Sequence, residues 1–398
     1  MDTTPGEGQQ GGDAYRRTTI VLALGATQTI AWASSYYLPA ILGEPMARAL
    51  AITGIEVYAA FSVALLVAAV LGPRVGRTIA RLGGRGVLKI SNLLYAAGLL
   101  MLAVAGSRWT MWAGWLAIGA GMGLGLYDAA FATLGRIFGT TARRPITGIT
   151  LMAGFASTIG WPLSALGLEF FGWRWTCVAW ALVHLLVALP VNRFLIPLPP
   201  SVKATAGHTE NPHIPMDANM WLLGFAFAAG WVISTAMAVH LPRLLETAGA
   251  TTVEAIAAGA LIGPGQVAAR LVEATLMQRH HPLLSARVSA ALHPIGAALG
   301  ALGTAGSVPM FAVLHGAGNG SLTIARGTVS LAIYGPVNYG YRLGILGAPA
   351  RIAQAAAPLG FGLLIERLGM GVLGVSAGLG IATLVAFCLV RADRASAG

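Results

Sequence analysis

The chain is a succession of apolar segments, each about 20 residues long, separated by short breaks rich in Arg or in Gly and Pro. A helix of this length is long enough to cross the hydrocarbon core of a bilayer. Of all residues, 56% are hydrophobic and only 10% are charged, and a water-soluble fold could not bury so much apolar surface. We therefore expect a polytopic membrane protein.

The apolar segments are typical of helices. Inside a bilayer every backbone amide must be hydrogen-bonded, which leaves helices or a closed barrel. Barrel strands would alternate polar and apolar residues, whereas segments such as 93–106 and 369–390 are apolar on all sides. The sequence predicts an all-α membrane protein with twelve transmembrane helices. The expected spans are residues 19–42, 55–75, 87–106, 109–136, 146–168, 173–196, 220–243, 252–273, 288–306, 308–334, 343–366 and 369–390.

The basic residues follow the loops on one side of the membrane. If the N-terminus is cytoplasmic, few of the 25 Lys and Arg residues fall on the outer side. The outer ones are Arg48, Arg108, Arg174, Arg243 and Arg367. Arg326 and Arg351 are counted with the inner group. This distribution follows the positive-inside rule and predicts that both termini are cytoplasmic. The net charge of +11 is then a consequence of topology, and the dispersed Arg residues do not indicate nucleic-acid binding.

The chain divides into two halves around a polar central segment rich in Pro and His. The predicted parts are a disordered cytoplasmic tail (1–15), an N-terminal six-helix bundle (16–196), a cytoplasmic linker (197–219), a C-terminal six-helix bundle (220–390) and a second cytoplasmic tail (391–398). Short sequences recur in both halves. Leu71-Gly72-Pro73 is echoed by Ile262-Gly263-Pro264, and Gly135-Arg136 by Ala325-Arg326. Such echoes predict a duplicated unit, which is typical of transporters that bind solute where two repeats meet.

The loop between the second and third spans resembles a signature of the major facilitator superfamily. Residues 76–85 (GRTIARLGGR) match its glycine and arginine positions at Gly76, Arg81, Gly83 and Arg85. Ala80 stands where the family usually has Asp. The resemblance extends over essentially the full chain and implies the major facilitator fold, two pseudo-symmetric six-helix bundles, with these four residues as a cytoplasmic gating motif.

A second resemblance concerns spans four and five. Residues 119–136 (GAGMGLGLYDAAFATLGR) are similar to the monocarboxylate and oxalate/formate carrier branch of that superfamily. The resemblance implies that Arg270, within span eight, contacts an anionic substrate. Gln266 occupies a position that resembles an Asp in animal monocarboxylate carriers, so their proton-coupling scheme cannot be carried over intact.

An ionisable residue inside a span raises the free energy of membrane insertion, and such residues mark transport paths. Asp128 lies in span four among apolar neighbours, with no Lys or Arg one helical turn away. It is a candidate proton carrier, although a static salt bridge between helices remains the alternative. His315, deep in span ten, is a second candidate because imidazole carries protons near neutral pH.

Arginines in the spans could recognise an anion. Arg270 and Asp128 have similar expected depths and could meet across the inner vestibule, where a guanidinium would bind a carboxylate. Alternatively, Arg270 extends to the interface or pairs with Glu273. Arg351 invites the same two interpretations, with extension to the interface favoured.

Further polar and aromatic residues fall on helix faces that could line a path. The substrate-binding candidates are Gln28, Trp32, Tyr36, Tyr127, Gln266, Arg270, Asn319 and Arg351. Packing is the commoner role for Trp32 and Tyr36.

Nothing in the sequence indicates an enzyme, a cofactor or a metal site. The P-loop sequence for ATP is missing, as are H-E-x-x-H and cysteine clusters. We expect a secondary transporter of the bacterial inner membrane, working as a monomer by alternating access and coupled to protons or another ion. The expected solute is a small organic anion such as a monocarboxylate. The alternative is an exporter of a neutral, metalloid or hydrophobic toxic compound.

Overall fold

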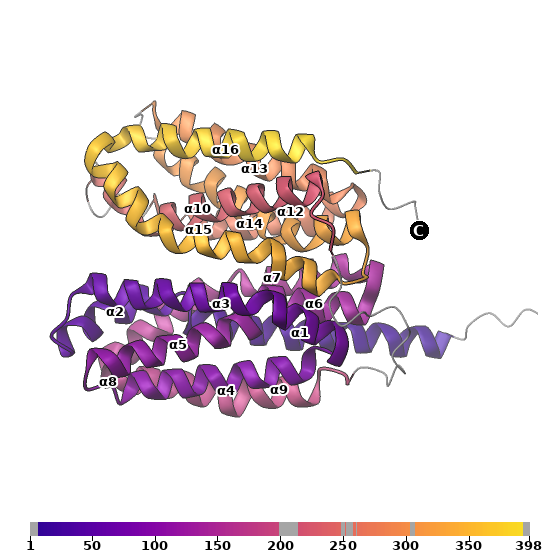
Figure 1. Cartoon of the computed structure of the whole chain (residues 1–398), viewed down its shortest axis with the longest axis horizontal. Coiled ribbons are helices and arrows are strands. Elements are labelled where there is room, and N and C mark those ends of the chain that lie inside the picture. The colour runs from indigo at the N-terminus through magenta and orange to yellow at the C-terminus, as the bar shows by residue number, and fades with distance from the viewer. Residues whose placement is uncertain are drawn as a thin grey trace, which may run out of the picture.

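The computed structural model describes residues 7–198, 214–247, 251, 258–259, 261–302 and 307–392. These residues form helices and connecting turns, with no strand among them, and the helices gather into two bundles that lie side by side (Figure 1). Five described stretches are long and apolar enough to cross a membrane by length and composition. They are Gly54–Leu82, Gly84–Ala103, Arg108–Phe194, which holds several consecutive helices, Ala218–Ala238 and Gly369–Leu389.

The first bundle, indigo to magenta in Figure 1, forms one half of the molecule. It contains α1 (Glu7–Ser34), α2 (Leu38–Ala49), α3 (Gly54–Leu82), α4 (Gly84–Ala103), α5 (Arg108–Gly125), α6 (Tyr127–Phe138), the 3-10 turn η1 (Gly139–Ala142), α7 (Arg143–Ala153), α8 (Ala156–Val183), the π-helical turn η2 (His184–Ala188) and α9 (Leu189–Phe194). The second bundle contains α10 (Ala218–Thr247), α12 (Ile262–Thr275), the turn η3 (Met277–Arg279), α13 (Pro282–Gly300), α14 (Ser307–Tyr334), α15 (Tyr339–Leu368), the turn η4 (Gly369–Gly371) and α16 (Val372–Leu389).

Each bundle has its own apolar core. One cluster of buried side chains runs through the first bundle, and two further clusters fill the second. The first cluster also takes in Leu331, Tyr339, Leu343 and Ala355 of the second bundle. The two halves therefore have cores of their own and also share an apolar interface.

The start of the chain differs from the prediction. We expected a disordered tail over 1–15 and a span over 19–42, but α1 extends back to Glu7 and ends at Ser34. Once a helix has formed, each added residue gains a hydrogen bond, so it can continue past the bilayer into polar residues. A new helix, α2, starts at Leu38 with Pro39 at its N-terminus, where the missing amide hydrogen of proline is tolerated.

The expected span 109–136 is also wrong as a single helix. α5 ends at Gly125, Leu126 is extended (φ −80°, ψ −171°), and α6 begins at Tyr127. Most of the expected linker 197–219 and the beginning of the expected span 252–273 lie outside the described residues. The expected span 146–168 is interrupted as well, because α7 ends at Ala153 and α8 begins at Ala156. The remaining expected spans each overlap a described helix, with ends displaced by several residues.

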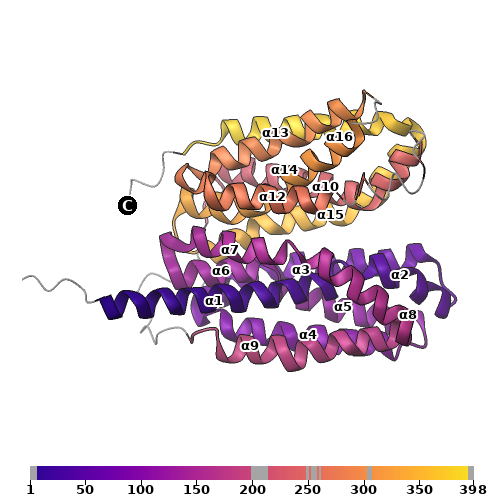
Figure 2. The ribbon, with the colours of Figure 1, turned by 180° about the vertical axis from the view of Figure 1, so that it is seen from behind.

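The two bundles meet along a few helices that contain closely spaced small residues. Viewed from behind, α3, α6 and α7 of the first bundle lie toward the second bundle (Figure 2), where α3 and α6 pack on α15 and α7 packs on α12 and α14. A side chain at Gly76 would collide with the backbone of Gly340, so glycine is needed for this close approach. Gly83, with φ of 80°, forms the turn between α3 and α4.

The rest of the predicted gating motif is also at this turn. Arg136 donates to the backbone carbonyls of Ala80 and Arg81, which closes the end of α3 against α6. The side chain of Arg81 is exposed and that of Arg85 is half-buried. The gating role of the motif stays a prediction, and the contact at Gly76 supports it.

Candidate functional site

The break between α5 and α6 lies beside the interface of the two bundles and positions Asp128. Because α6 begins at Tyr127, Asp128 lies in its first turn, where the positive end of the helix dipole favours a carboxylate. Gln28 of α1 donates from Nε2 to the carbonyl oxygen of Gly125 at 2.5 Å, which satisfies a carbonyl at the end of α5. Broken helices of this kind form solute sites in many transporters.

Two arginines of the second bundle bind Asp128. Arg326 of α14 has its Nη2 at 2.8 Å from both carboxylate oxygens, and Arg351 of α15 donates from Nη2 to Oδ2 at 2.8 Å. All three side chains are at most 9% exposed. One carboxylate thus faces two guanidiniums, so this cluster carries a charge of −1 + 2 = +1.

A cavity between the bundles lies against these arginines. It is lined by Arg326, Arg351 and Gln354 together with aromatic side chains from both halves, and its volume is about 10 Å³, room for roughly one water molecule. The aromatic residues are Trp32, Tyr36, Tyr127 and Trp231. Tyr36 accepts from Gln354 Nε2 at 2.7 Å and lies 3.4 Å from the hydroxyl of Thr235. A solute can enter only when the two halves move apart.

Two donors on residues that line this cavity have no hydrogen-bond partner among the described residues. They are Arg326 Nε and Trp32 Nε1. Arg326 is 4% exposed and Trp32 is 7% exposed, so bulk water does not reach them freely. A buried donor without an acceptor destabilises the folded state, because it has lost its hydrogen bonds to water. A ligand that brings acceptor oxygens would satisfy both donors.

Arg270 does not meet Asp128, so that prediction is wrong. It donates instead to the Gly320 carbonyl at 3.5 Å and to Gln266 Oε1 at 3.3 Å, on the face of α12 that packs on α7. The alternatives are wrong as well, since Arg270 is only 4% exposed and Glu273 pairs with another arginine. The physical reason is packing: α14 and α15, not α12, lie against α6.

The sequence pointed to only one of the two arginines that bind Asp128. Arg351 was a substrate-binding candidate for which extension to the interface was favoured, but it is 8% exposed and pairs with Asp128. Arg326 was counted among the basic residues on the inner side and missed as a site residue. The signal that could have found it is its place in the long apolar helix 307–334, which contains no acidic residue.

His315 and Asn319 lie elsewhere. The two residues line a separate cavity of about 30 Å³ inside the second bundle. There His315 Nδ1 is 2.9 Å from Nδ1 of His293 on α13, and both rings are buried. His293 Nε2 has no partner among the described residues. The histidine pair is therefore distinct from the Asp128 cluster.

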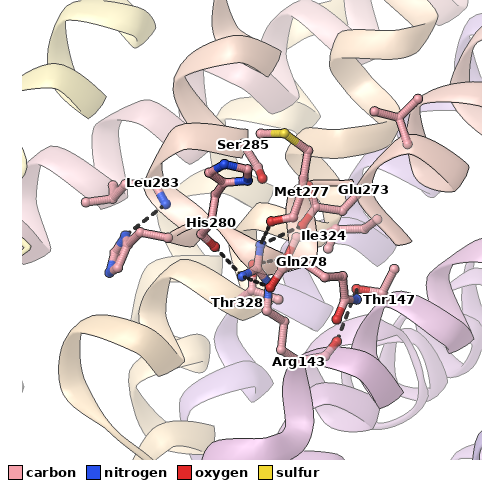
Figure 3. Close-up of polar contacts among 12 residues, drawn as sticks. Arg143, Thr147, Glu273, Met277, Gln278, His280, Leu283, Ser285, Ile324 and Thr328 are labelled. Atoms are coloured by element: carbon pink, nitrogen blue, oxygen red, sulfur yellow. Dashed lines mark hydrogen bonds and ion pairs between the residues drawn. The ribbon is translucent and has the colours of Figure 1, made fainter. Parts of the chain in front are cut away.

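A second polar contact joins the bundles at the end of the molecule that carries η1 and η3, which the charge distribution predicts to be cytoplasmic. Figure 3 shows Arg143 of α7 reaching the end of α12 and the turn after it. Its guanidinium lies 3.1 Å from Glu273 Oε1 and donates to the carbonyl oxygens of Met277 at 2.8 Å, Gln278 at 3.1 Å and His280. These contacts hold the two halves together at this end.

The loop beside Arg143 also contains His281. Burial lowers the pKa of His281, and the guanidiniums of Arg143 and Arg287 lower it further. Its Nδ1 accepts the Leu283 amide at 3.2 Å and caps α13, which requires an unprotonated nitrogen.

Comparisons with known proteins agree with this architecture. The sequence profile described as Major Facilitator Superfamily matches residues 24–312. No curated protein sequence matches the chain significantly. The structure of the proton:xylose symporter XylE, bound to 6-bromo-6-deoxy-D-glucose, superimposes with a TM-score of 0.74 at 12% identity, covering 95% of this chain and 96% of that one.

Two other solved structures are similarly close in fold. The human organic anion transporter MFSD10 (TETRAN) has a TM-score of 0.72 at 16% identity, with 95% of this chain and 99% of that chain covered. The E. coli fucose:proton symporter FucP has a TM-score of 0.70 at 15% identity, with 93% and 98% covered. At these identities the likeness concerns the fold.

Proposed function

The chain belongs to the major facilitator superfamily, a family of secondary transporters with a twelve-helix fold, and we propose that its solute is a small organic anion whose transport is coupled to protons at Asp128. The observation that carries this proposal is the excess of positive charge at the cavity between the bundles. Two buried guanidiniums share one carboxylate there, and a donor on one of them has no acceptor in the part of the chain that the structure describes.

An anion fits this cluster because guanidinium groups bind carboxylates through paired, charge-assisted hydrogen bonds. Asp128 occupies the place that a substrate carboxylate would take. When Asp128 accepts a proton, its attraction for Arg326 and Arg351 falls, and both guanidiniums become available to the solute. Proton uptake and anion binding would then favour each other.

The Asp128 cluster also links the two halves. Asp128 is on the first bundle and its two partners are on the second, so its protonation weakens an ionic contact between the moving parts. The contacts of Arg143 close one end of the molecule in this structure. Alternating access would require them to break while the opposite end closes.

A neutral or hydrophobic toxic compound remains the second candidate solute. The observation that favours it is the aromatic lining, in which Trp32 lies against Tyr36, Tyr127 and Trp231. Such rings would suit an uncharged apolar solute equally well. The excess positive charge is the reason to prefer an anion.

The test is ligand binding to the detergent-purified chain, measured by thermal unfolding. A panel of small carboxylates should stabilise the protein, by about 2.7 kcal/mol at a concentration of 100 Kd. Arg351→Gln should weaken carboxylate binding roughly 10- to 150-fold, with only partial recovery in Arg351→Lys because lysine lacks the planar fork. Arg270→Gln is the matched comparison, since Arg270 is buried but does not line the cavity. Equal stabilisation by uncharged amides of the same acids would overturn the proposal.

A further inference from the structure

The most specific feature of the cavity is a pair of parallel indole rings, one from each bundle. Trp32 of α1 and Trp231 of α10 have ring centroids 6.3 Å apart and planes that differ by 5°. Trp32 is held in place by Tyr127 and Tyr36, whose ring centroids lie at 4.9 and 5.1 Å. Each half thus contributes one of two parallel indole rings to the wall of the cavity.

Two parallel rings suit a flat group between them. A planar ring between two others needs about 3.5 Å on each side, so about 7 Å between the planes of the outer rings. The cavity now has room for roughly one water molecule, so the bundles must part before a ring can enter this gap. A puckered, saturated ring carries hydrogens on both faces and needs a wider gap.

The charged end of the ligand would lie next to this gap. The Arg326 guanidinium carbon lies over the Trp231 ring, 5.8 Å from its centre, so a ligand that reaches Trp231 comes close to this cation. Among the described residues, Trp32 Nε1 and Arg326 Nε have no acceptor, and both residues line the same cavity. A carboxylate has two oxygens that can accept from several donors.

We infer that the substrate is a small aromatic carboxylate, with its ring between Trp32 and Trp231 and its carboxylate at Arg326 and Arg351. This inference rests on the proposed function and narrows its substrate class. Stacking supplies selectivity for flat rings, and the guanidiniums supply selectivity for the anion.

The experiment compares three probes on the full-length, detergent-purified chain: benzoate, cyclohexanecarboxylate and benzamide. Benzoate should bind most tightly. In Trp231→Leu the affinity for benzoate should fall roughly 2- to 10-fold, the range expected for loss of an aromatic pair, while that for cyclohexanecarboxylate changes less. Trp221→Leu is the matched control, because Trp221 lies on the same helix but is 66% exposed on its outer surface.

The outcomes separate this inference from the proposed function. If cyclohexanecarboxylate binds as tightly as benzoate, or if Trp231→Leu and Trp221→Leu behave alike, the aromatic preference is overturned while anion recognition stands. If benzamide binds as tightly as benzoate, anion recognition itself fails. If neither carboxylate binds, both proposals are overturned.

Discussion

Replacing Asp128 by Asn tests the central ionic cluster with almost no change in shape. In the described part of the chain, the Asp128 carboxylate is the only acidic group paired with Arg326 or Arg351. Asparagine keeps an oxygen that can accept one hydrogen bond but removes the negative charge. The variant therefore leaves two buried guanidiniums without a counter-charge.

The expected cost follows from the burial of the cluster. Removing one partner of a buried ion pair lowers the free energy of unfolding by about 3–5 kcal/mol, since the remaining charge stays desolvated. A carboxylate ligand would bring the missing charge back. We therefore expect Asp128→Asn to be destabilised when empty and to gain more stability than wild type from a bound carboxylate.

The assay has two parts. Thermal unfolding in detergent, with and without the carboxylate that wild type binds best, measures the loss and its recovery. Transport in liposomes then compares exchange with gradient-driven uptake: Asp128→Asn should retain exchange and lose the acceleration by a proton gradient. Glu44→Gln is the matched control, because the Glu44–Arg48 pair is largely exposed (69% and 74%) and is worth at most about 1 kcal/mol.

The reasoning fails if Asp128→Asn keeps wild-type stability, or if its gradient-driven rate and pH dependence match those of wild type. The first result would mean that the pairs contribute nothing to the fold. The second would assign Asp128 a purely structural role and leave the coupling group elsewhere.

Three further predictions concern the contacts around the cluster. Arg143→Ala should open the end held by Arg143, whereas Arg144→Ala, at an exposed residue, should not. Distances between spin labels on the two bundles measure the opening, and equal distance distributions in wild type and Arg143→Ala would mean that the Arg143 contacts do not hold this end. Gly76→Ala should cost about 1–3 kcal/mol by overpacking the interface, while Gly86→Ala, which meets nothing within 4 Å, should be neutral in the same unfolding assay. His315→Gln should alter the pH dependence of transport and leave substrate affinity unchanged, and an unaltered pH profile would make the histidine pair structural.

Hydropathy predicted most of the helices but could not predict where they break. The stretch GAGMGLGLYDAAF is continuously apolar apart from Asp128, so the sequence reads as one span. At this break the Gly125 carbonyl accepts a hydrogen bond from the side chain of a distant residue, Gln28. A signal that comes from tertiary contact does not appear in a local pattern.

The candidate site was predicted in part. Asp128, Arg351, Trp32, Tyr36 and Tyr127 were all chosen from the sequence, and the structure brings them together. The sequence cannot say which of several buried arginines an aspartate will meet, because that depends on which helices pack against α6.

Arg326 was missed for a specific reason. The echo between Gly135-Arg136 and Ala325-Arg326 suggested equivalent positions in the two halves, and both arginines were counted with the basic residues on the inner side. The structure gives them different roles: Arg136 closes the end of α3, whereas Arg326 points into the interface and pairs with Asp128. A duplicated sequence therefore predicted the architecture but not the asymmetry that forms the site.

The charge of the site constrains how a proton and an anion can move together. The empty site, with Asp128 ionised, carries −1 + 2 = +1. With a proton on Asp128 and a monocarboxylate bound, it carries 0 + 2 − 1 = +1. Because the loaded and empty forms have equal charge, the membrane potential, worth about 2.3 kcal/mol per charge per 100 mV, would not favour either. Accumulation in liposomes should therefore respond to an imposed pH gradient and not to an imposed potassium diffusion potential. Net accumulation driven by the diffusion potential alone would show that the proton and the anion do not bind this cluster in a one-to-one ratio.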